Sequence, residues 1–291
     1  MDQKFNILYN EPMKNHTTFR VGGPAEMLVS PTLEKMPELL AFAKEKNLPI
    51  TVIGNGSNLL VSDNGINGLV IEIGKGLDHI EIHKDTIKAG AGSLLSKVAN
   101  EAAAAGLGGM EFAAGIPGSI GGAVVMNAGA YGGEMKDILI SVDVITKDGE
   151  FITLPVDQLD LAYRHSCIIE KEYIVLAATI KLNPCEETKI RQTMAELREK
   201  RVSKQPLEFP SAGSTFKRPE GYFAGKLIED AGLRGYTVGG AQVSEKHCGF
   251  VINKNNATAA DIMQLIKDVQ ARVKENSGVD LETEVKLLGW E

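Results

Sequence analysis

Apolar and polar residues along the chain follow the two periods that are typical of strands and helices. β-branched runs and strict alternation predict strands, which fall at residues 50–53, 69–73, 80–83, 86–92, 141–146, 150–154, 173–182, 250–253 and 280–288. Two short joins between these strands, Lys84-Asp85 and Lys147-Asp148-Gly149, are typical of hairpin turns. The chain is therefore expected to contain antiparallel strand pairs.

Helices are predicted from apolar spacing, capping residues and stop signals. They fall at residues 33–47, 93–105, 186–203, 224–231 and 258–276. Ser93 is interpreted as the cap of the second helix and Gly106 as its stop, while Thr258 and Asp261 form a capping box before the last. Helices and strands mix along the whole chain, which predicts an α+β fold.

The length of 291 residues predicts more than one domain. A β-α-β pattern indicates a first subdomain at residues 1–75, and the hairpins with the long strand indicate a second at 76–200. The chain then enters a stretch rich in Pro and Gly, which opens a compact third domain at 201–291.

The segment from Gly106 to Gly133 is the most unusual in composition, since ten of its 28 residues are glycine. Each glycine costs about 1 kcal/mol of ordering entropy relative to alanine, so a segment of this kind is a poor helix and a poor strand. Bare backbone is useful where a ligand lies against the chain, and consecutive N–H groups bind anions. The segment predicts a cradle for a large phosphate-bearing cofactor; a set of tightly packed turns without a ligand is the alternative.

A second glycine loop follows the strand at 50–53. The chain has no GxxxxGK[ST] sequence, and neither loop carries a complete Rossmann fingerprint. Two separate loops could instead hold one extended dinucleotide. The candidate cofactor-binding residues are Gly54, Asn55, Gly56, Ser57, Asn58, Gly115, Ile116, Pro117, Gly118, Ser119, Gly121, Gly122 and Asn127.

Charge and composition exclude several classes of function. The formal net charge of -7 argues against nucleic-acid and anionic-membrane partners, which need a basic face. No apolar stretch has the length of a membrane span or a signal-peptide core, so the protein is expected in the cytoplasm. The three cysteines are far apart and predict free thiols, and the five histidines include no HExxH, so no metal site is expected.

Several motifs in order resemble one family over nearly the whole chain. They are HTTFRVGGPA, GNGSNLLV, EFAAGIPGSIGGAVVMNAGAYGGE, YRHSCI, GSTFKRP, VSEKHCGFVIN and LETEVKLLG. The chain resembles the UDP-N-acetylenolpyruvoylglucosamine reductases, also called UDP-N-acetylmuramate dehydrogenases, which are bacterial cell-wall flavoenzymes of the vanillyl-alcohol-oxidase (PCMH-type) FAD group. The resemblance implies non-covalent FAD held by the first two subdomains, NADPH as reductant, and a C-terminal substrate domain. The implied reaction reduces the enolpyruvyl ether of UDP-N-acetylglucosamine to UDP-N-acetylmuramate, a peptidoglycan precursor.

The resemblance also implies the catalytic residues. Ser214 in GSTFK matches the proton donor, Glu284 in ETEVK matches the acidic partner, and Arg164 in YRHS matches the arginine. A guanidinium can grip the substrate carboxylate through two charge-assisted bonds. Without the family, these residues would read as a turn serine, a surface arginine and the solvated face of a strand.

Lys204, Lys217 and Arg218 are a local basic cluster in an acidic chain and the expected seat of the UDP diphosphate, with solvated loop charges as the alternative. The loops between the predicted elements are short, which indicates the form of the family that lacks a tyrosine-bearing insertion over the substrate. No residue is therefore assigned to a lid over the diphosphate. Two rival functions remain at this stage: another FAD-dependent oxidase of the same group, and a non-catalytic protein that binds a flavin or a nucleotide sugar.

Overall fold

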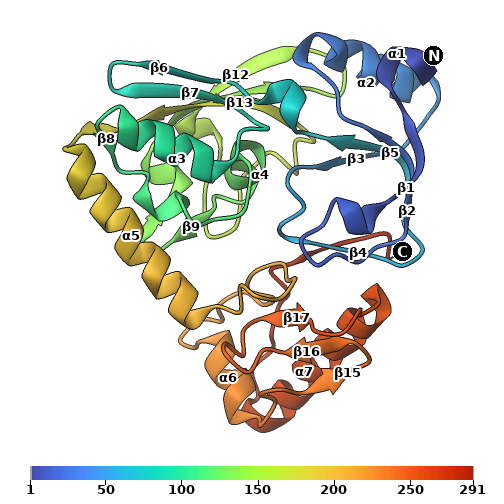
Figure 1. The fold of residues 1–291 in the computed structure, drawn as a ribbon. Coiled ribbons are helices and arrows are strands. Elements are labelled where there is room, and N and C mark those ends of the chain that lie inside the picture. The colour runs from blue at the N-terminus through green and yellow to red at the C-terminus, as the bar shows by residue number, and fades with distance from the viewer. Residues whose placement is uncertain (1, 291) are drawn as a thin grey trace. The chain divides into compact units, whose positions relative to one another are not determined.

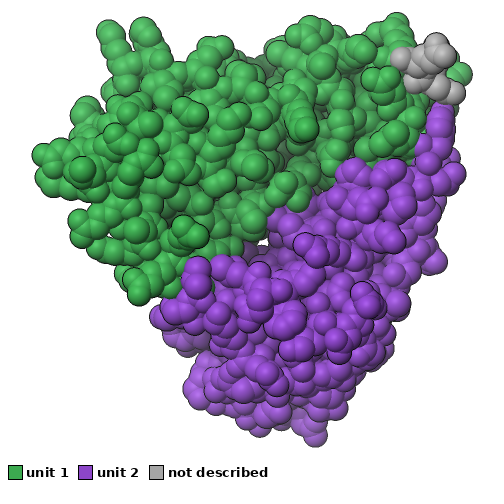
Figure 2. Space-filling model, in the orientation of Figure 1, with its two compact units in different colours: residues 1–8, 27–55, 68–201 green, residues 9–26, 56–67, 202–291 purple. Residues whose placement is uncertain are grey.

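The computed structural model describes residues 2–290, and these residues form two compact units. Unit 1 comprises residues up to 8 together with 27–55 and 68–201, and unit 2 comprises 9–26, 56–67 and 202–291 (Figure 2). The boundary after residue 201 lies where the sequence enters the stretch rich in Pro and Gly. Residues 9–26 and 56–67 cluster with the C-terminal part rather than with the subdomain at 1–75, whereas the three-part division itself stays a prediction.

Unit 1 is built around a five-stranded antiparallel sheet in the order β12-β11-β13-β7-β6 (Figure 1). Its strands are β6 (Ile80–His83), β7 (Thr86–Gly90), β11 (Leu139–Ile145), β12 (Phe151–Pro155) and β13 (Ile174–Lys181). Both predicted hairpins are confirmed, and Gly149 completes the second turn at a φ of +85°. Strand β13 is central, and all but two of its eight residues are buried.

Helices and short strands complete unit 1. The helices are α1 (Asp2–Phe5), α2 (Met36–Glu45), α3 (Leu95–Ala104), α4 (Ile120–Val125) and α5 (Glu187–Lys204), the last of which continues into unit 2. The short strands are β8 (Leu107–Gly108), which pairs with β14 (Asn183–Pro184), and β9 (Gly129–Ala130), which pairs with β10 (Gly133–Glu134). Helix α4 packs on β13 and β7.

One local prediction in unit 1 is wrong. Ser93 does not cap α3, because Leu94 is the N-cap residue and the Ser93 hydroxyl donates instead to Asp78 Oδ1 and the His79 carbonyl. The glycine-rich segment was expected to be a poor helix and a poor strand, and its one α-helix within residues 106–133 is the six-residue α4, which has two glycines inside it. Its buried Ile120 and Val124 supply the packing that compensates for the glycines.

A further sheet has the order β1-β2-β5-β3. These strands are β1 (Leu8–Pro12), β2 (Pro24–Val29), β3 (Ile50–Ile53) and β5 (Ile66–Glu72). Strands β3 and β5 run parallel, with Ile50 opposite Leu69. The parallel pair confirms the predicted strands at 50–53 and 69–73, and the first glycine loop begins where β3 ends.

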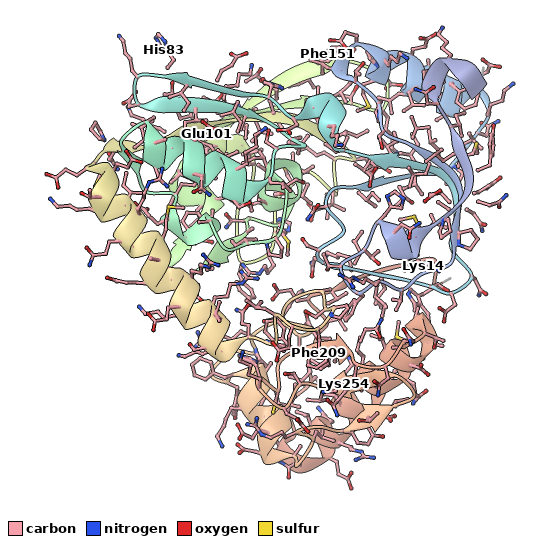
Figure 3. All side chains as sticks on the ribbon, viewed as in Figure 1. Lys14, His83, Glu101, Phe151, Phe209 and Lys254 are labelled. Carbon is pink, nitrogen blue, oxygen red and sulfur yellow. The ribbon has the colours of Figure 1, made fainter. Side chains whose placement is uncertain are left out.

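Unit 2 has a three-stranded antiparallel sheet, β15-β16-β17, on which the long helix α7 packs (Figure 1). The elements are β15 (Thr237–Val238), β16 (Ala241–Val243), β17 (Val251–Asn253), α6 (Ala224–Asp230) and α7 (Ala259–Ser277). On this unit the Lys254 ammonium lies 4.1 Å from the centre of the Phe209 ring, and both side chains are labelled in Figure 3.

The predicted last strand at 280–288 is shorter than expected. Only β18 (Lys286–Leu288) is a strand, and it runs parallel to β4 (Leu59–Val61). Further upstream, Thr283 makes an isolated antiparallel bridge with Phe216. The end of the chain therefore pairs first with the 214–217 loop and then with the segment that follows the first glycine loop.

The N-terminus of α7 is capped from two places in the sequence. The predicted capping box is confirmed: Thr258 Oγ1 accepts from the Asp261 N–H at 3.0 Å, and Asp261 Oδ2 accepts from the Thr258 N–H at 3.0 Å. Asp63, far away in sequence, accepts from the N–H groups of Ala259 and Ala260 at 2.9 and 2.8 Å. Carboxylates here satisfy donors that have no partner within the helix and also complement the positive end of its dipole.

Replacing Asp261 by asparagine is expected to make the free energy of unfolding fall less steeply as the pH is lowered. Hydrogen bonds from the backbone of Thr258 and Gly240 hold the pKa of Asp261 below its usual value. A lowered pKa contributes stability above the usual pKa of an aspartate, and this contribution disappears as the pH falls through the lowered pKa. Asp261→Asn should therefore lower the free energy of unfolding at pH 7 by about 0.5–1 kcal/mol.

Urea unfolding between pH 7 and pH 2.5 measures this effect. The difference between wild type and Asp261→Asn should shrink toward the acid end. Glu275→Gln, at an exposed carboxylate of the same helix, is the matched control and should follow the wild-type curve. A difference that stays constant down to pH 2.5 would contradict the assignment.

Candidate active site

The two glycine loops meet inside unit 1. Asn55 Nδ2 donates to the carbonyl oxygen of Pro117 at 2.6 Å, which ties the first loop to the second. A Cβ added to Gly54 would lie 2.6 Å from Ser119 Oγ, so only glycine allows this approach. The two loops are therefore in contact at Gly54 and Asn55, whereas their joint binding of a dinucleotide stays a prediction.

Ser119 carries a buried hydroxyl whose hydrogen bonding is incomplete. The residue is 2% exposed, and its Oγ has no hydrogen-bond partner among residues 2–290. It occupies the N-cap position of α4 but makes no side-chain capping bond. A buried hydroxyl without a partner costs about 1–3 kcal/mol, so it points to a ligand that would supply the bond.

Some residues of the second loop contact the rest of the protein, whereas others have exposed backbone. The N–H of Gly121 donates to the Ala91 carbonyl at 2.8 Å, the carbonyl of Gly118 accepts from Leu95 at 3.0 Å, and Ile116 packs against the core of unit 1. Gly122, in contrast, is exposed, and an added Cβ would have only Ser119 Oγ within 4 Å, at 3.9 Å. Gly122 and Ser119 thus fit a cofactor that lies against bare main chain.

The rest of the first loop belongs to unit 2 and serves a different purpose. Gly56 has a φ of +61°, and an added Cβ would overlap the carbonyl oxygen of His16. Asn58 Nδ2 donates to the backbone carbonyl oxygen of Glu284 at 3.0 Å. The backbone carbonyl of Asn58 accepts from the Lys286 N–H at 2.9 Å. The loop therefore fixes the segment that carries Glu284.

Ser214 and Glu284 lie on two segments joined through Thr215. The Thr215 carbonyl accepts from the Glu284 N–H at 2.9 Å, and the Lys217 N–H donates to the Glu282 carbonyl at 2.9 Å. Thr215 is fully buried, and its hydroxyl accepts from the Val251 N–H at 3.0 Å. The backbone on both sides of Ser214 and Glu284 is therefore held in place, while both side chains are partly exposed.

Arg164 stands at the tip of a tight turn in unit 1. Ala162 and His165 exchange two backbone hydrogen bonds of 3.2 Å across the turn, and Arg164 has a φ of +54°, in the left-handed region. Its guanidinium lies 4.9 Å from the Tyr163 ring centre, and Nη2 lies 3.4 Å from the Gly129 carbonyl oxygen. Left-handed backbone costs a non-glycine residue about 1–2 kcal/mol, so the turn must be held by its surroundings.

Asn127 is part of what holds this turn. Its Nδ2 donates to the Ala162 carbonyl at 3.1 Å and to Glu134 Oε2 at 2.7 Å, and its Oδ1 accepts from the Lys136 N–H at 2.9 Å. The residue is completely buried. Its side chain therefore supports the Arg164 turn, and its predicted contact with the cofactor stays a prediction.

The three cations expected at the diphosphate all belong to unit 2, and two of them have a close neighbour there. Lys217 Nζ lies 3.0 Å from Glu282 Oε2, and the Arg218 guanidinium lies 4.1 Å from the Phe223 ring centre. Lys204 is exposed at the last residue of α5.

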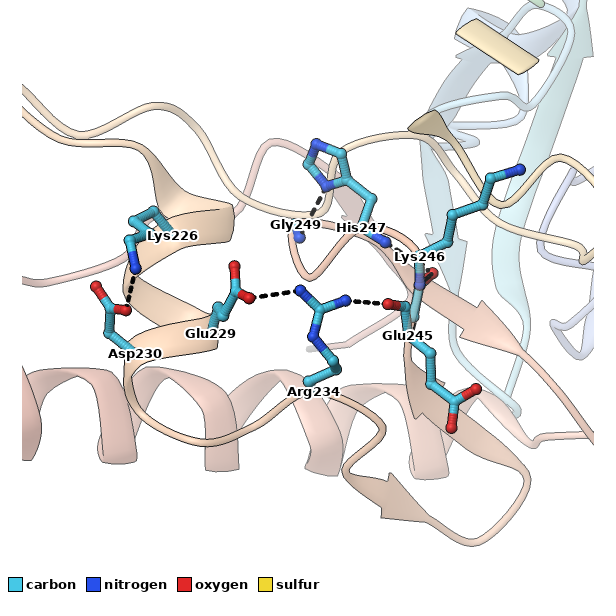
Figure 4. A network of polar contacts seen from close by, with 9 residues as sticks. Lys226, Glu229, Asp230, Arg234, Glu245, Lys246, His247 and Gly249 are labelled. Atoms are coloured by element: carbon cyan, nitrogen blue, oxygen red, sulfur yellow. Dashed lines mark hydrogen bonds and ion pairs between the residues drawn. The ribbon is translucent and has the colours of Figure 1, made fainter. Parts of the chain in front are cut away.

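A polar network that the sequence did not indicate supports the loop behind Thr215 (Figure 4). Arg234 bonds to Glu229 at 2.6 Å and to the Glu245 carbonyl, and His247 Nδ1 accepts from the Gly249 N–H at 3.0 Å. The Gly249 carbonyl in turn accepts from the Thr215 N–H at 2.9 Å. Burial lowers the pKa of His247, and Arg234 and Lys204 lower it further, so the imidazole is neutral at pH 7.

Two predicted absences can be compared with the described residues. Within residues 2–290 no group of three or more His, Cys, Asp or Glu side chains is arranged to hold a metal ion. In the same range no helix combines the length and the apolar character needed to cross a membrane. The three cysteines are free thiols, as predicted.

Comparisons with known proteins match this chain along its length. Residues 25–155 match an FAD binding domain, and residues 205–288 match the C-terminal domain of UDP-N-acetylenolpyruvoylglucosamine reductase. The chain is 60% identical to the UDP-N-acetylenolpyruvoylglucosamine reductase of Agathobacter rectalis, over 98% of this chain and 95% of the relative. It is 54% identical to a protein of the same name from Clostridium botulinum, over 98% and 94%. The crystal structure of a reductase of that name from Thermus caldophilus aligns with a TM-score of 0.85 and 38% identity, over 98% of this chain and 99% of the other.

Proposed function

Since this chain belongs to the family of UDP-N-acetylenolpyruvoylglucosamine reductases, we propose that it reduces the enolpyruvyl ether of UDP-N-acetylglucosamine to UDP-N-acetylmuramate, with NADPH as the electron donor. The observation that carries the proposal is identity of 54–60% to curated relatives over 98% of the chain. The protein is an FAD-dependent oxidoreductase of peptidoglycan synthesis. The two rival functions, an oxidase of the same FAD group and a non-catalytic binding protein, are not favoured.

Bound FAD would supply hydride transfer between NADPH and the terminal vinyl carbon of the substrate. The residues that would hold it are Ser119, with its buried hydroxyl, and the open backbone at Gly122, together with Gly54 and Asn55. The hydroxyl of Ser119 would gain the partner that it lacks in protein. Non-covalent attachment agrees with the absence of histidine between Gly54 and Val61.

Ser214, Arg164 and Glu284 are the proposed catalytic residues. Arg164 would grip the substrate carboxylate and, with Glu284, stabilise the charge that develops on the carbon next to it. Ser214 would deliver the proton to that carbon. What supports these roles is that rigid backbone carries all three: the Asn127-braced turn for Arg164, and the bonds around Thr215 for the other two.

The substrate diphosphate is proposed to bind Lys204, Lys217 and Arg218. The Lys217 ammonium would bind the diphosphate in place of the exposed Glu282 carboxylate or together with it. The planar guanidinium of Arg218 lies over the Phe223 ring. The arrangement suits bidentate binding of phosphate oxygens by arginine and a point charge from lysine.

We further propose that residues 1–75 and 76–200 hold FAD, that residues 201–291 bind substrate, and that the enzyme works in the cytoplasm without nucleic-acid or membrane partners. Free thiols at all three cysteines support a reducing compartment.

The visible spectrum of the purified protein tests the proposed function. The protein should carry the visible absorption bands of an oxidised flavin, lose them on anaerobic addition of NADPH, and regain them when the enolpyruvyl sugar nucleotide is added. Recovery should need the enolpyruvyl group, so UDP-N-acetylglucosamine is the control and should leave the protein bleached. Bleaching by an alcohol in place of NADPH, followed by fast recovery with oxygen and none with the enolpyruvyl sugar, would favour the oxidase instead.

A further inference from the structure

Helix α5 has one sheltered face, and that face ends in a charged residue. Of the eighteen residues of the helix, only Ile190, Met194, Leu197 and Arg201 are not fully exposed. They follow one another at intervals of four, three and four, which places them on one side of the helix. Ile190 is buried and Met194 packs against the core of unit 1. The fourth position of this apolar stripe is therefore occupied by an arginine.

Arg201 lies against the second glycine loop. A Cβ added to Gly115 would lie 3.3 Å from Arg201 Cδ and 3.5 Å from Nη1, so the absence of a side chain at Gly115 makes room for the arginine. Burial lowers the pKa of Arg201, and the electrostatic effect of Tyr131 offsets part of this change. Gly115 and Tyr131 are both exposed.

Within residues 2–290 Arg201 makes no hydrogen bond and no ion pair. Other cations of α5 do: Arg191 bonds to Glu187 at 2.6 Å and Lys189 to Glu186 at 3.0 Å, although both are exposed. A partly buried charge without a partner is costly, because the guanidinium loses water and gains no hydrogen bond in exchange. An arginine at this place is explained when an anion completes its surroundings.

We propose that Arg201 binds a negatively charged group of FAD where the cofactor passes the Gly115 turn. The inference rests on the proposed function, which supplies the cofactor. Two groups of FAD have the required chemistry: the pyrophosphate, and the carbonyl side of the isoalloxazine ring, which gains negative charge on reduction. A guanidinium serves either through charge-assisted hydrogen bonds. The exposed Gly115 backbone and the buried hydroxyl of Ser119, both in the same loop, are the other contacts that the cofactor would make there.

The test uses the apoprotein of wild type, Arg201→Gln and Arg201→Lys, with Arg198→Gln as the matched control, since Arg198 is an exposed arginine of the same helix. Without FAD, Arg201→Gln should be at least as stable to heat as wild type, because an uncompensated charge has been removed. With FAD, its gain in melting temperature should be smaller than that of wild type. Arg198→Gln should match wild type in both conditions, and Arg201→Lys should retain part of the FAD effect.

Binding and redox titrations separate the two sources of negative charge. If the pyrophosphate is the partner, Arg201→Gln should bind oxidised FAD at least tenfold more weakly, and inorganic pyrophosphate should compete with FAD in wild type only. If the ring is the partner, the affinity for oxidised FAD should stay unchanged, and the midpoint potential of the bound flavin should become more negative. Unchanged affinity together with an unchanged potential would overturn the proposal and leave Arg201 as a packing residue.

The results for the Arg201 variants can be distinguished from a failure of the proposed reaction. A wild-type protein that binds FAD but is not reoxidised by the enolpyruvyl sugar would refute the proposed reaction and leave the Arg201 result standing. A wild-type protein that turns over normally, with an Arg201→Gln variant that binds and tunes FAD identically, would refute only the role of Arg201.

Discussion

Ser214→Ala is expected to leave reduction of the flavin by NADPH unchanged and to slow its reoxidation by the enolpyruvyl substrate by about 10²–10⁴-fold, the range typical of a lost general acid. The substitution removes only the hydroxyl. The backbone at this position is fixed by the neighbouring Thr215, whose N–H donates to Gly249 and whose carbonyl accepts from Glu284. The loss should therefore appear in the protonation step and not in folding or in cofactor binding.

Anaerobic stopped-flow measurements at 450 nm follow the two half-reactions separately. Ser211→Ala, in the same loop and also partly buried, is the matched control and should behave as wild type in both. Ser214→Cys keeps a dissociable proton and should recover part of the lost rate. Reoxidation of Ser214→Ala at the wild-type rate would remove Ser214 from the mechanism, whereas a defect in the NADPH half-reaction would assign it to a different step.

Features that depend on neighbouring residues could be predicted from the sequence. The capping box of Thr258 and Asp261 and the hairpin at Lys147-Asp148-Gly149 are both observed, because each is determined by side chains within a few positions. The mixture of helices and strands followed from the same local signals, whereas the FAD-binding fold was implied by the family resemblance. The position of Arg201 is also visible in the local pattern, because it is the one charged residue in the series Ile190, Met194, Leu197 and Arg201 on the less exposed side of α5.

Features that depend on residues far apart in the sequence could not be predicted. Asp63 caps α7 from almost two hundred residues away, and nothing near Asp63 indicates this. Ser93 has the composition of a helix cap, yet Asp78 and His79 compete successfully for its hydroxyl. The hydrogen bonds that Asn127 makes to Glu134 and to the Ala162 carbonyl likewise join segments that nothing near Asn127 in the sequence indicates.

The glycines show the same limit most clearly. Composition alone cannot separate a glycine that makes room for protein from one that makes room for a ligand. In the structure, Gly56 faces the His16 carbonyl in a left-handed conformation, whereas Gly122 lies in α4, where an added Cβ would be 3.9 Å from Ser119 Oγ, an ordinary van der Waals contact. The two proposed uses of glycine therefore occur in one protein, and they can be distinguished by adding a single methyl group.

Gly56→Ala is expected to lower the free energy of unfolding by about 4 kcal/mol or more, because left-handed backbone and a backbone overlap add together. The added Cβ would meet the carbonyl of His16, which cannot swing aside as a flexible side chain could. Gly122→Ala should act in the opposite direction: alanine favours the helix by about 0.5–1 kcal/mol, while the methyl group lies where the cofactor is proposed to rest. The apoprotein should become slightly more stable and its affinity for FAD should fall.

Urea unfolding of the apoproteins and titration with FAD test both substitutions together. Gly56→Ala should lose stability whether or not FAD is present, and failure to fold at all would be the extreme of the same result. A Gly56→Ala protein within 1 kcal/mol of wild type would show that the His16 segment yields easily. A Gly122→Ala protein that binds FAD as tightly as wild type would move the cofactor away from this backbone, because a methyl group cannot be added under a ligand in van der Waals contact without loss of affinity.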